Sequence, residues 1–406
     1  MTSANSANDT GEARPPILAG VRVLDLGRYV AGPFCATLLG DLGADVIRVD
    51  RIGGSEDRGL MPPPGQGDGM MFLAANRNKR SIALDLSVQE GREILARLAE
   101  RSHIVVANLP PSALTKIGMD YAALQRRRAD IILTSINTFG EVGPDVDKVG
   151  FDGLGQAMSG VLAISGYPGR PARAQVTYVD YAAAVAAAFG TLAAYIEWLR
   201  TGEGQHVQGS LMGAALSMMN AVILEEALCG RTRTPTGNRS PVSGPSDVYR
   251  TTDGWIIVQI VGDPLFRRWV KLVGQPGLLS DPRFVSDFSR GQHGEELSKL
   301  MSEWCATRSS AEALSALENA RIPAGPVLSP RQALNYPPFQ AAGFFRTIAV
   351  PEISEPVAFA DAPVRLSRHQ RPLSAPPRCG AHSVEILEEM EFGKAEIERL
   401  RVKGVV

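Results

Sequence analysis

Cysteine and histidine are scarce and scattered in this chain of 406 residues. No two of the four cysteines have CxxC spacing, and the five histidines show neither HExxH nor a similar pattern. The chain is far too long for a scaffold held by disulfides, and metal sites draw on closely spaced Cys and His ligands. The sequence therefore predicts reduced thiols, no metal site and a cytoplasmic location.

Net charge and long apolar runs are also lacking. The 42 Lys and Arg against 43 Asp and Glu give a net charge of −1, whereas nucleic-acid binding needs a basic face. No run of about 18 residues is free of charged and polar breaks, so we expect no membrane span. Residues 1–16 are small and polar without an apolar signal core, and we expect a disordered tail there. One phosphorylated small molecule stays possible as a ligand of a local basic pocket.

The first half of the chain alternates strand-like and helical segments. Apolar runs predict strands at 21–26, 45–50, 81–86, 103–107 and 130–136, with helices between them at 34–42, 88–101 and 112–128. This alternation predicts an α/β fold with a largely parallel sheet and helices on both faces. The loop Gly27–Pro33 lacks GxGxxG, which disfavours a dinucleotide-dependent oxidoreductase.

The second half changes character twice. Helices are predicted at 181–199 and 211–229, followed by a Pro-, Gly- and Ser-rich linker at 230–246. A hairpin within 247–260 and three further helices predict a smaller α+β domain over 247–326, and the segment Ile322–Pro326 marks its end. We therefore expect a large domain over 17–229, to which residues 327–406 return.

Asp180 stands at the start of the long Ala-rich helix and has two possible roles. Aspartate is a preferred N-cap, where its carboxylate accepts backbone N–H bonds. Alternatively, the helix N-terminus keeps the carboxylate ionised and available as a nucleophile. Local sequence favours the cap and leaves both roles open.

Eight segments together resemble one family. They are Leu18–Leu26, Ala31–Asp50, Asn76–Leu86 (NRNKRSIALDL), Gly150–Gly160 (GFDGLGQAMSG), Thr201–Val207 (TGEGQHV), Thr251–Trp255, Ile322–Val327 (IPAGPV) and Gly380–Leu387. In this order they resemble the class III CoA-transferases, the family of formyl-CoA transferase and carnitine CoA-transferase, to which the α-methylacyl-CoA racemases are related. The likeness spans nearly the whole chain.

The resemblance implies both a fold and a reaction. It implies a Rossmann-like large domain, a small domain, a C-terminus returning to the large domain, and an interlocked dimer of ring-like monomers. It also implies that Asp180 is the nucleophile, which attacks an acyl-CoA to give a mixed anhydride and then an aspartyl-CoA thioester. Coenzyme A and acyl-CoA are then substrates, and no tightly bound cofactor is expected.

The same resemblance implies a set of binding residues. Residues expected to contact CoA or the thioester are Val30, Ala31, Arg51, Arg77, Lys79, Arg80, Asn108, Leu109, Lys116, Asn137 and Phe139. The cations among them suit phosphates. A hypothesis adds Arg239 as the contact for the distal carboxylate of an acceptor acid, with a dicarboxylate such as succinate as one participant.

Two alternatives remain within the resemblance. A racemase needs two opposed proton-transfer groups, and the racemases carry a His in the segment that here reads Gly150-Phe151-Asp152. Phe151 cannot transfer a proton, so we favour the transferase and expect Asp152 to be structural. A CoA-binding homologue without catalysis is the third possibility.

Overall fold

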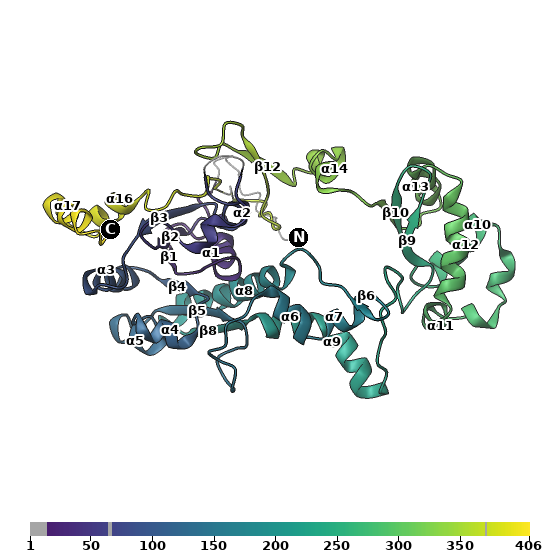
Figure 1. Cartoon of the computed structure of the whole chain (residues 1–406), viewed down its shortest axis with the longest axis horizontal. Coiled ribbons are helices and arrows are strands. Elements are labelled where there is room, and N and C mark those ends of the chain that lie inside the picture. The colour runs from purple at the N-terminus through teal and green to yellow at the C-terminus, as the bar shows by residue number, and fades with distance from the viewer. Residues whose placement is uncertain (1–13, 64–66, 370–371) are drawn as a thin grey trace, which may run out of the picture. The chain divides into compact units, whose positions relative to one another are not determined.

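The computed structural model describes residues 14–63, 67–369 and 372–406 (Figure 1). These form two compact units. The first unit comprises the described residues within 14–159, 174–221 and 343–406, and the second comprises 160–173 and 222–342. The predicted tail lies outside the described residues over positions 1–13.

A six-stranded parallel sheet forms the centre of the first unit. Its order is β3-β2-β1-β4-β5-β8, and the bounds are β1 (Arg22–Asp25), β2 (Asp45–Asp50), β3 (Lys79–Ala83), β4 (Ile104–Ala107), β5 (Ile132–Asn137) and β8 (His206–Ser210). The strands β1 and β4 are neighbours, but the connection that follows β1 crosses one face of the sheet and the connection that follows β4 crosses the other. In such a sheet the crevice at the carboxyl ends of these two strands is the usual ligand site.

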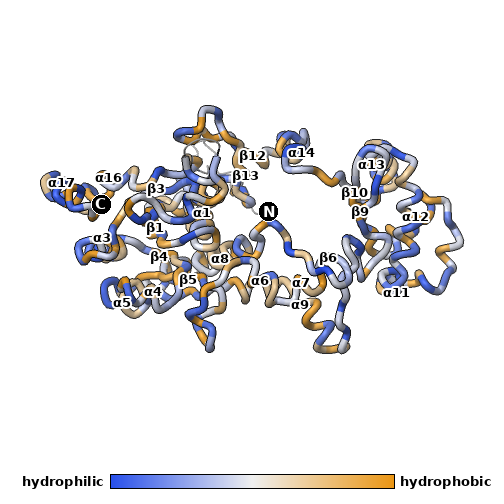
Figure 2. Tube along the Cα trace, viewed as in Figure 1, coloured by the Kyte–Doolittle hydropathy of each residue, from blue (hydrophilic) through white to orange (hydrophobic). Residues whose placement is uncertain are grey.

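Helices cover both faces of this sheet, as predicted. One face packs against α3 (Gln89–Glu100), α5 (Tyr121–Arg127), α16 (Ser383–Glu389) and α17 (Lys394–Val402). The other packs against α1 (Ala31–Asp41), α8 (Tyr178–Thr201) and the start of α9 (Leu211–Cys229). Figure 2 shows hydrophobic and hydrophilic residues alternating along α3 and α17, which is typical of helices with one buried face.

Shorter elements complete the first unit. They are η1 (Glu56–Gly59), α2 (Met70–Ala75), α4 (Pro111–Lys116), α6 (Asp152–Met158), β12 (Phe345–Ile348) and β13 (Val357–Ala360). By length and composition alone, α8 and α9 could each cross a membrane. The core helix of a soluble protein has the same composition, and Ala183, Ala184 and Ala187 of α8 are buried against α1 and the sheet.

The second unit has its own small core. Its antiparallel sheet has the order β11-β10-β9, with β9 (Ser246–Arg250), β10 (Trp255–Gln259) and β11 (Ala324–Pro326). The unit also contains α7 (Val161–Ile164), β6 (Gly166–Tyr167), β7 (Arg170–Pro171), α10 (Asp263–Val273), η2 (Pro276–Leu279), η3 (Pro282–Phe284), α11 (Asp287–Gln292), α12 (Gly294–Ala306), α13 (Ser310–Asn319), α14 (Pro330–Leu334) and α15 (Pro337–Ala341). Trp269, Tyr249 and Phe266 fill the core.

Two features of the chain differ from the sequence-based expectation. Ile322–Pro326 was expected to break the pattern, yet Ala324–Pro326 is a strand that pairs with β10. Pro326 is tolerated because β11 is an edge strand. A proline whose nitrogen faces away from the neighbouring strand removes no hydrogen bond from the sheet. The return to the first unit accordingly begins at Gly343, and the units divide within α9.

Candidate active site

A pocket of about 150 Å³ lies at the carboxyl ends of the central strands. We call it the Asp180 pocket. Its wall comprises Arg28, Tyr29, Val30, Ala31, Glu56, Asn108, Leu109, Pro110, Ile136, Asn137, Thr138, Val146, Lys148, Val149, Gly150, Phe151, Asp180 and Leu211. These residues follow β1, β2, β4, β5 and β8, so the pocket occupies the switch point between β1 and β4. A cavity of this size holds a molecule about as large as benzene, which suits an acyl group or small acid.

The loop after β1 is fixed from two sides. Asn108 accepts the Arg28 N–H through Oδ1 and donates through Nδ2 to the Arg28 carbonyl, both at 2.7 Å. The Tyr29 N–H donates to Asp57 Oδ2 at 3.0 Å, and Tyr29 has a left-handed φ of 63°. An L-residue in this region is held there only by its surroundings. The loop thus delivers Val30 and Ala31 to the pocket in one conformation.

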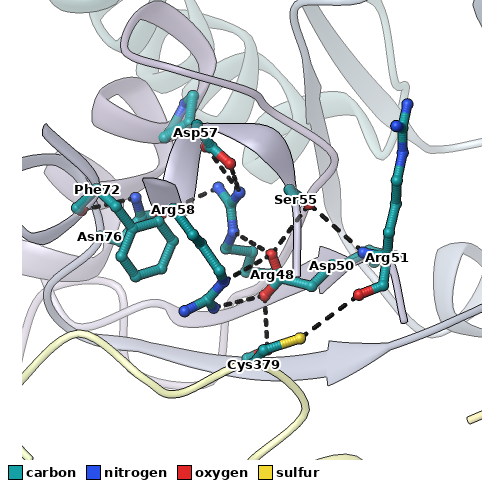
Figure 3. Close-up of polar contacts among 12 residues, drawn as sticks. Arg48, Asp50, Arg51, Ser55, Asp57, Arg58, Phe72, Asn76 and Cys379 are labelled. Carbon is teal, nitrogen blue, oxygen red and sulfur yellow. Dashed lines mark hydrogen bonds and ion pairs between the residues drawn. The ribbon is translucent and has the colours of Figure 1, made fainter. Parts of the chain in front are cut away.

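Buried ion pairs lie beneath this loop (Figure 3). Arg48 binds Asp57 with Nη2 at 2.8 and 3.0 Å and donates from Nε to Asp50 at 3.1 Å. Arg58 in turn binds Asp50 at 2.7 Å. Burial opposes ionisation of Asp50, but the Arg48 charge and the Arg58 hydrogen bond outweigh it and hold the Asp50 pKa below its usual range. Asp57 is thereby locked as the acceptor for Tyr29.

Asp180 lies in the first turn of α8, and its side chain opens into the pocket. Among the described residues its carboxylate forms no hydrogen bond or ion pair, although the residue is only 9% exposed. Burial chiefly, and the charge of Asp152 in addition, raise the Asp180 pKa from 3.8 to about 7. An open, uncompensated carboxylate of this kind is a candidate nucleophile.

The capping role predicted for Asp180 belongs to another residue. The N-cap position of α8 is Thr177, whose side chain makes no capping bond. Asp152 Oδ2 accepts the N–H groups of Val179 and Asp180 at 2.7 and 3.3 Å. The helix terminus therefore stabilises the Asp152 carboxylate, and the expectation that it keeps Asp180 ionised was wrong for this reason.

The structure brings six of the predicted site residues together. Asp180, Val30, Ala31, Asn108, Leu109 and Asn137 all line the pocket. Asn137 Oδ1 accepts the Gly140 N–H at 2.5 Å, and its Nδ2 is the one buried side-chain nitrogen or oxygen in the described part of the chain that has no partner. Asn108 uses its amide to hold Arg28, so it shapes the pocket through the loop.

Three of the predicted phosphate-binding cations lie elsewhere. Lys79 is fully buried, and its Nζ donates to Asp25, Asn76 and two backbone carbonyls at 2.7–3.1 Å. Arg77 forms a buried pair with Asp41, and Arg80 pairs with Asp45, Glu385 and Glu389. None of the three lines the pocket. The structure corrects the prediction for Arg77, Lys79 and Arg80, because internal carboxylates occupy their donors.

The remaining predicted residues are outside the pocket wall. Arg51 is exposed and pairs at 3.5 Å with Glu56, which does line the pocket, so Arg51 stands near its rim. Lys116 is exposed on α4, and Phe139 is half-buried after β5. Arg239 belongs to the second unit, where its Nη1 donates to the Gly291 carbonyl at 3.4 Å.

Sequence reasoning missed several pocket residues. Arg28, Tyr29, Glu56, Thr138 and Lys148 line the wall but were not selected. Arg28 is buried, and its guanidinium donates to three backbone carbonyls, so its charge supports the loop. Three of the five, Arg28, Tyr29 and Thr138, come just after predicted strands. This position at a strand end is the sequence feature that could have identified them.

The pocket wall bears on the racemase alternative. Phe151 lies in it and packs edge-on against Tyr29, with ring centroids 5.2 Å apart. Of the described residues, no histidine lines this pocket. The His/Asp acid–base pair of a racemase is therefore not assembled around Asp180.

Comparison with known proteins agrees with this site. Residues 18–383 match the model of CoA-transferase family III. The chain is 34% identical to succinyl-CoA–D-citramalate CoA-transferase of Chloroflexus aurantiacus, over 97% of this chain and 99% of that protein. It is 31% identical to succinate–glutarate CoA-transferase of Agrobacterium fabrum, over 93% and 96% of the two chains.

A solved structure supports the same relationship. A CaiB/BaiF family protein from Brucella suis superimposes with a TM-score of 0.81 at 29% identity, covering 93% of this chain and all of that one. It shares the mixed α/β fold around a parallel sheet. With the matched model and the relatives above, this shows that the chain belongs to CoA-transferase family III and is a CoA-transferase.

Proposed function

We propose that this enzyme transfers CoA between carboxylic acids through an aspartyl-CoA thioester on Asp180. The observation that carries the proposal is the Asp180 carboxylate itself, which is buried, free of hydrogen bonds among the described residues and open to a pocket at the switch point. A carboxylate with this setting is poorly solvated and reactive toward an electrophilic carbonyl.

The steps balance without another reactant. An Asp180 oxygen attacks the thioester carbonyl carbon, and the C–S bond breaks, so CoA leaves as a thiolate beside a neutral mixed anhydride. The thiolate attacks the Asp180 carbonyl carbon, and the C–O bond to it breaks. The donor acid departs as a carboxylate and leaves the aspartyl-CoA thioester. The acceptor carboxylate then reverses both steps.

Each attack creates an oxyanion that needs nearby donors. The helix α1 begins at Ala31, and its N-cap residue Val30 makes no side-chain capping bond. Val30 and Ala31 both line the pocket. First-turn N–H groups and the positive end of the helix dipole suit a developing negative charge. We assign oxyanion stabilisation to this helix start, and CoA phosphate binding to Arg51 at the pocket rim and Lys116.

The substrates we propose are a succinyl-CoA donor and a dicarboxylic acceptor. One of the two relatives above is named for succinyl-CoA and D-citramalate, and the other for succinate and glutarate. Arg239 is our candidate for the distal carboxylate, since a guanidinium can bind a carboxylate through two parallel hydrogen bonds.

An interlocked homodimer in the cytoplasm completes the proposal. Four large apolar side chains of α8, Val185, Phe189, Ile196 and Leu199, are 49–76% exposed and line one groove of the first unit. Contiguous exposed apolar surface of this kind is typical of an interface. A second copy of the chain is the occupant we propose. Sedimentation should give twice the chain mass, and a monomer would contradict this part.

Mass spectrometry tests the chemistry directly. The enzyme is incubated with succinyl-CoA and then with hydroxylamine or borohydride, and peptides are searched for modification at Asp180. We expect modification in the wild type and none in Asp180→Asn. An unmodified wild type that binds succinyl-CoA would indicate a non-catalytic homologue. Deuterium exchange at the substrate α-carbon without acid transfer would instead indicate a racemase.

A further inference from the structure

Asp152 is a buried carboxylate that serves a helix other than its own. It is the first residue of α6, is only 3% exposed, and its Oδ2 accepts two N–H groups of the α8 first turn. One of these N–H groups belongs to Asp180 itself. This oxygen therefore helps to fix the backbone of the nucleophile.

The other oxygen of Asp152 is also held. Gln156, one turn later in α6 and 1% exposed, donates from Nε2 to Asp152 Oδ1 at 2.5 Å. Gln156 Oε1 accepts the Ala174 N–H at 3.0 Å. Gln156 thus connects Asp152 to the segment that leads into α8. In the described part of the chain no cation pairs with Asp152.

This geometry places the Asp152 carboxylate within hydrogen-bond distance of the Asp180 backbone. Charged groups elsewhere around α8 include Asp41 on α1, His206 on β8, Asp130, which accepts the Trp198 N–H, and Arg28, Glu56 and Lys148 in the pocket wall. Asp41 is paired with Arg77, and His206 contacts Ser135 and Glu141. Next to burial, Asp152 is the charge that raises the Asp180 pKa.

We infer that Asp152 is a positioning residue that fixes the first turn of α8 and, by its charge, destabilises the free Asp180 carboxylate relative to its acylated forms. The inference rests on the proposed role of Asp180 as nucleophile. Both the mixed anhydride and the aspartyl-CoA thioester are neutral at Asp180, so forming either one relieves repulsion between two buried carboxylates. Asp152 thereby favours acylation without touching the substrate.

The test is the pH dependence of acylation. Wild type, Asp152→Asn and the control Asp120→Asn are mixed with succinyl-CoA between pH 5 and 9, quenched, and weighed intact for the CoA adduct. Asp120 is the matched control because it caps α5 by accepting the Ala123 N–H at 3.0 Å, away from the pocket wall. Wild-type acylation should fall about tenfold per pH unit below pH 7.

In Asp152→Asn we expect the midpoint to move down by about one pH unit, with a lower plateau at high pH. Asp120→Asn should keep the wild-type midpoint. An Asp152→Asn variant with the wild-type midpoint and plateau would overturn the inference. If Asp180→Asn still forms the adduct, the proposed function itself fails, which is a different result.

A second variant covers the case in which Asp152→Asn does not fold. Gln156→Met removes the donor to Asp152 but leaves its charge. We expect the midpoint to stay at or above the wild-type value while the plateau falls, because position is loosened and charge is retained. A wild-type plateau in a folded Gln156→Met would contradict the positioning role.

Discussion

Replacing Asp180 by Asn should make the protein more stable at neutral and alkaline pH. The Asp180 pKa is about 7 in the folded state against 3.8 for an ordinary Asp. A raised folded-state pKa means that the folded state binds the proton more tightly, so its stabilising effect is complete below pH 3.8 and is lost as pH rises through 7. Above pH 7 the folded state therefore holds an unfavourable charge that Asn lacks.

The size of the effect follows from the two pKa values. A difference of about three pKa units corresponds to roughly 4 kcal/mol. Asn should cost little in return, because the Asp180 carboxylate accepts no hydrogen bond from the described residues. For a unit as large as the first one, this gain in the free energy of unfolding corresponds to an increase in Tm of roughly 8 °C at pH 8.

Calorimetry of wild type and Asp180→Asn between pH 5 and 8.5 measures this difference. The Tm gap should be level above about pH 8, where Asp180 is ionised in the folded state, and should narrow as the pH falls from 7 toward 5. Asp120→Asn serves as the control, since Asn caps a helix about as well as Asp and should leave Tm nearly unchanged at each pH. A gap that is constant with pH, or a less stable Asp180→Asn, would refute the argument that Asp180 is uncompensated.

Three further predictions separate structural from binding roles. Lys79→Met leaves the Asp25 carboxylate buried without its cation, so it should cost about 3–5 kcal/mol of stability and leave KM for acyl-CoA unchanged in the folded protein. Arg51→Ala should instead raise KM for acyl-CoA at constant Tm. The opposite pattern would indicate that Lys79, and not Arg51, binds CoA. Asp57→Asn removes the charge that pairs with Arg48 and leaves one acceptor oxygen where two now serve Arg48 and Tyr29. Chemical denaturation should show a loss of about 3–5 kcal/mol, and wild-type stability would contradict the role of the buried ion pairs. Arg239→Ala should raise KM for the acceptor acid in steady-state kinetics; an unchanged KM for every acid turned over would exclude the contact.

Local patterns predicted the elements well. The strand at 45–50 and the helix at 211–229 are found with the predicted bounds. Apolar periodicity and turn residues are local properties, so they can be read from the sequence. The strand at Ala324–Pro326 was missed, because a short strand containing proline is visible only through its pairing with Ile256–Val258.

The pocket was predicted unevenly for a related reason. Val30, Ala31 and Asn137 were assigned through the family resemblance, and they lie at or just after strand ends, which meet at one edge of a parallel sheet. Lys79 was misassigned because its partner Asp25 lies 54 residues away in the chain. A cation looks the same in sequence whether it faces a phosphate or a buried carboxylate, so only the fold distinguishes them.

The two carboxylates at the start of α8 connect stability to reactivity. The helix N–H groups are taken by Asp152, so Asp180 keeps its charge without compensation. The resting enzyme therefore contains a carboxylate that is destabilised by up to about 4 kcal/mol relative to one in water. Acylation removes that charge, so the same free energy favours the anhydride and the thioester. If this coupling holds, the stability that Asp180→Asn gains at pH 8 should decrease in an Asp152→Asn background, because the Asp152 charge contributes to that gain in addition to burial.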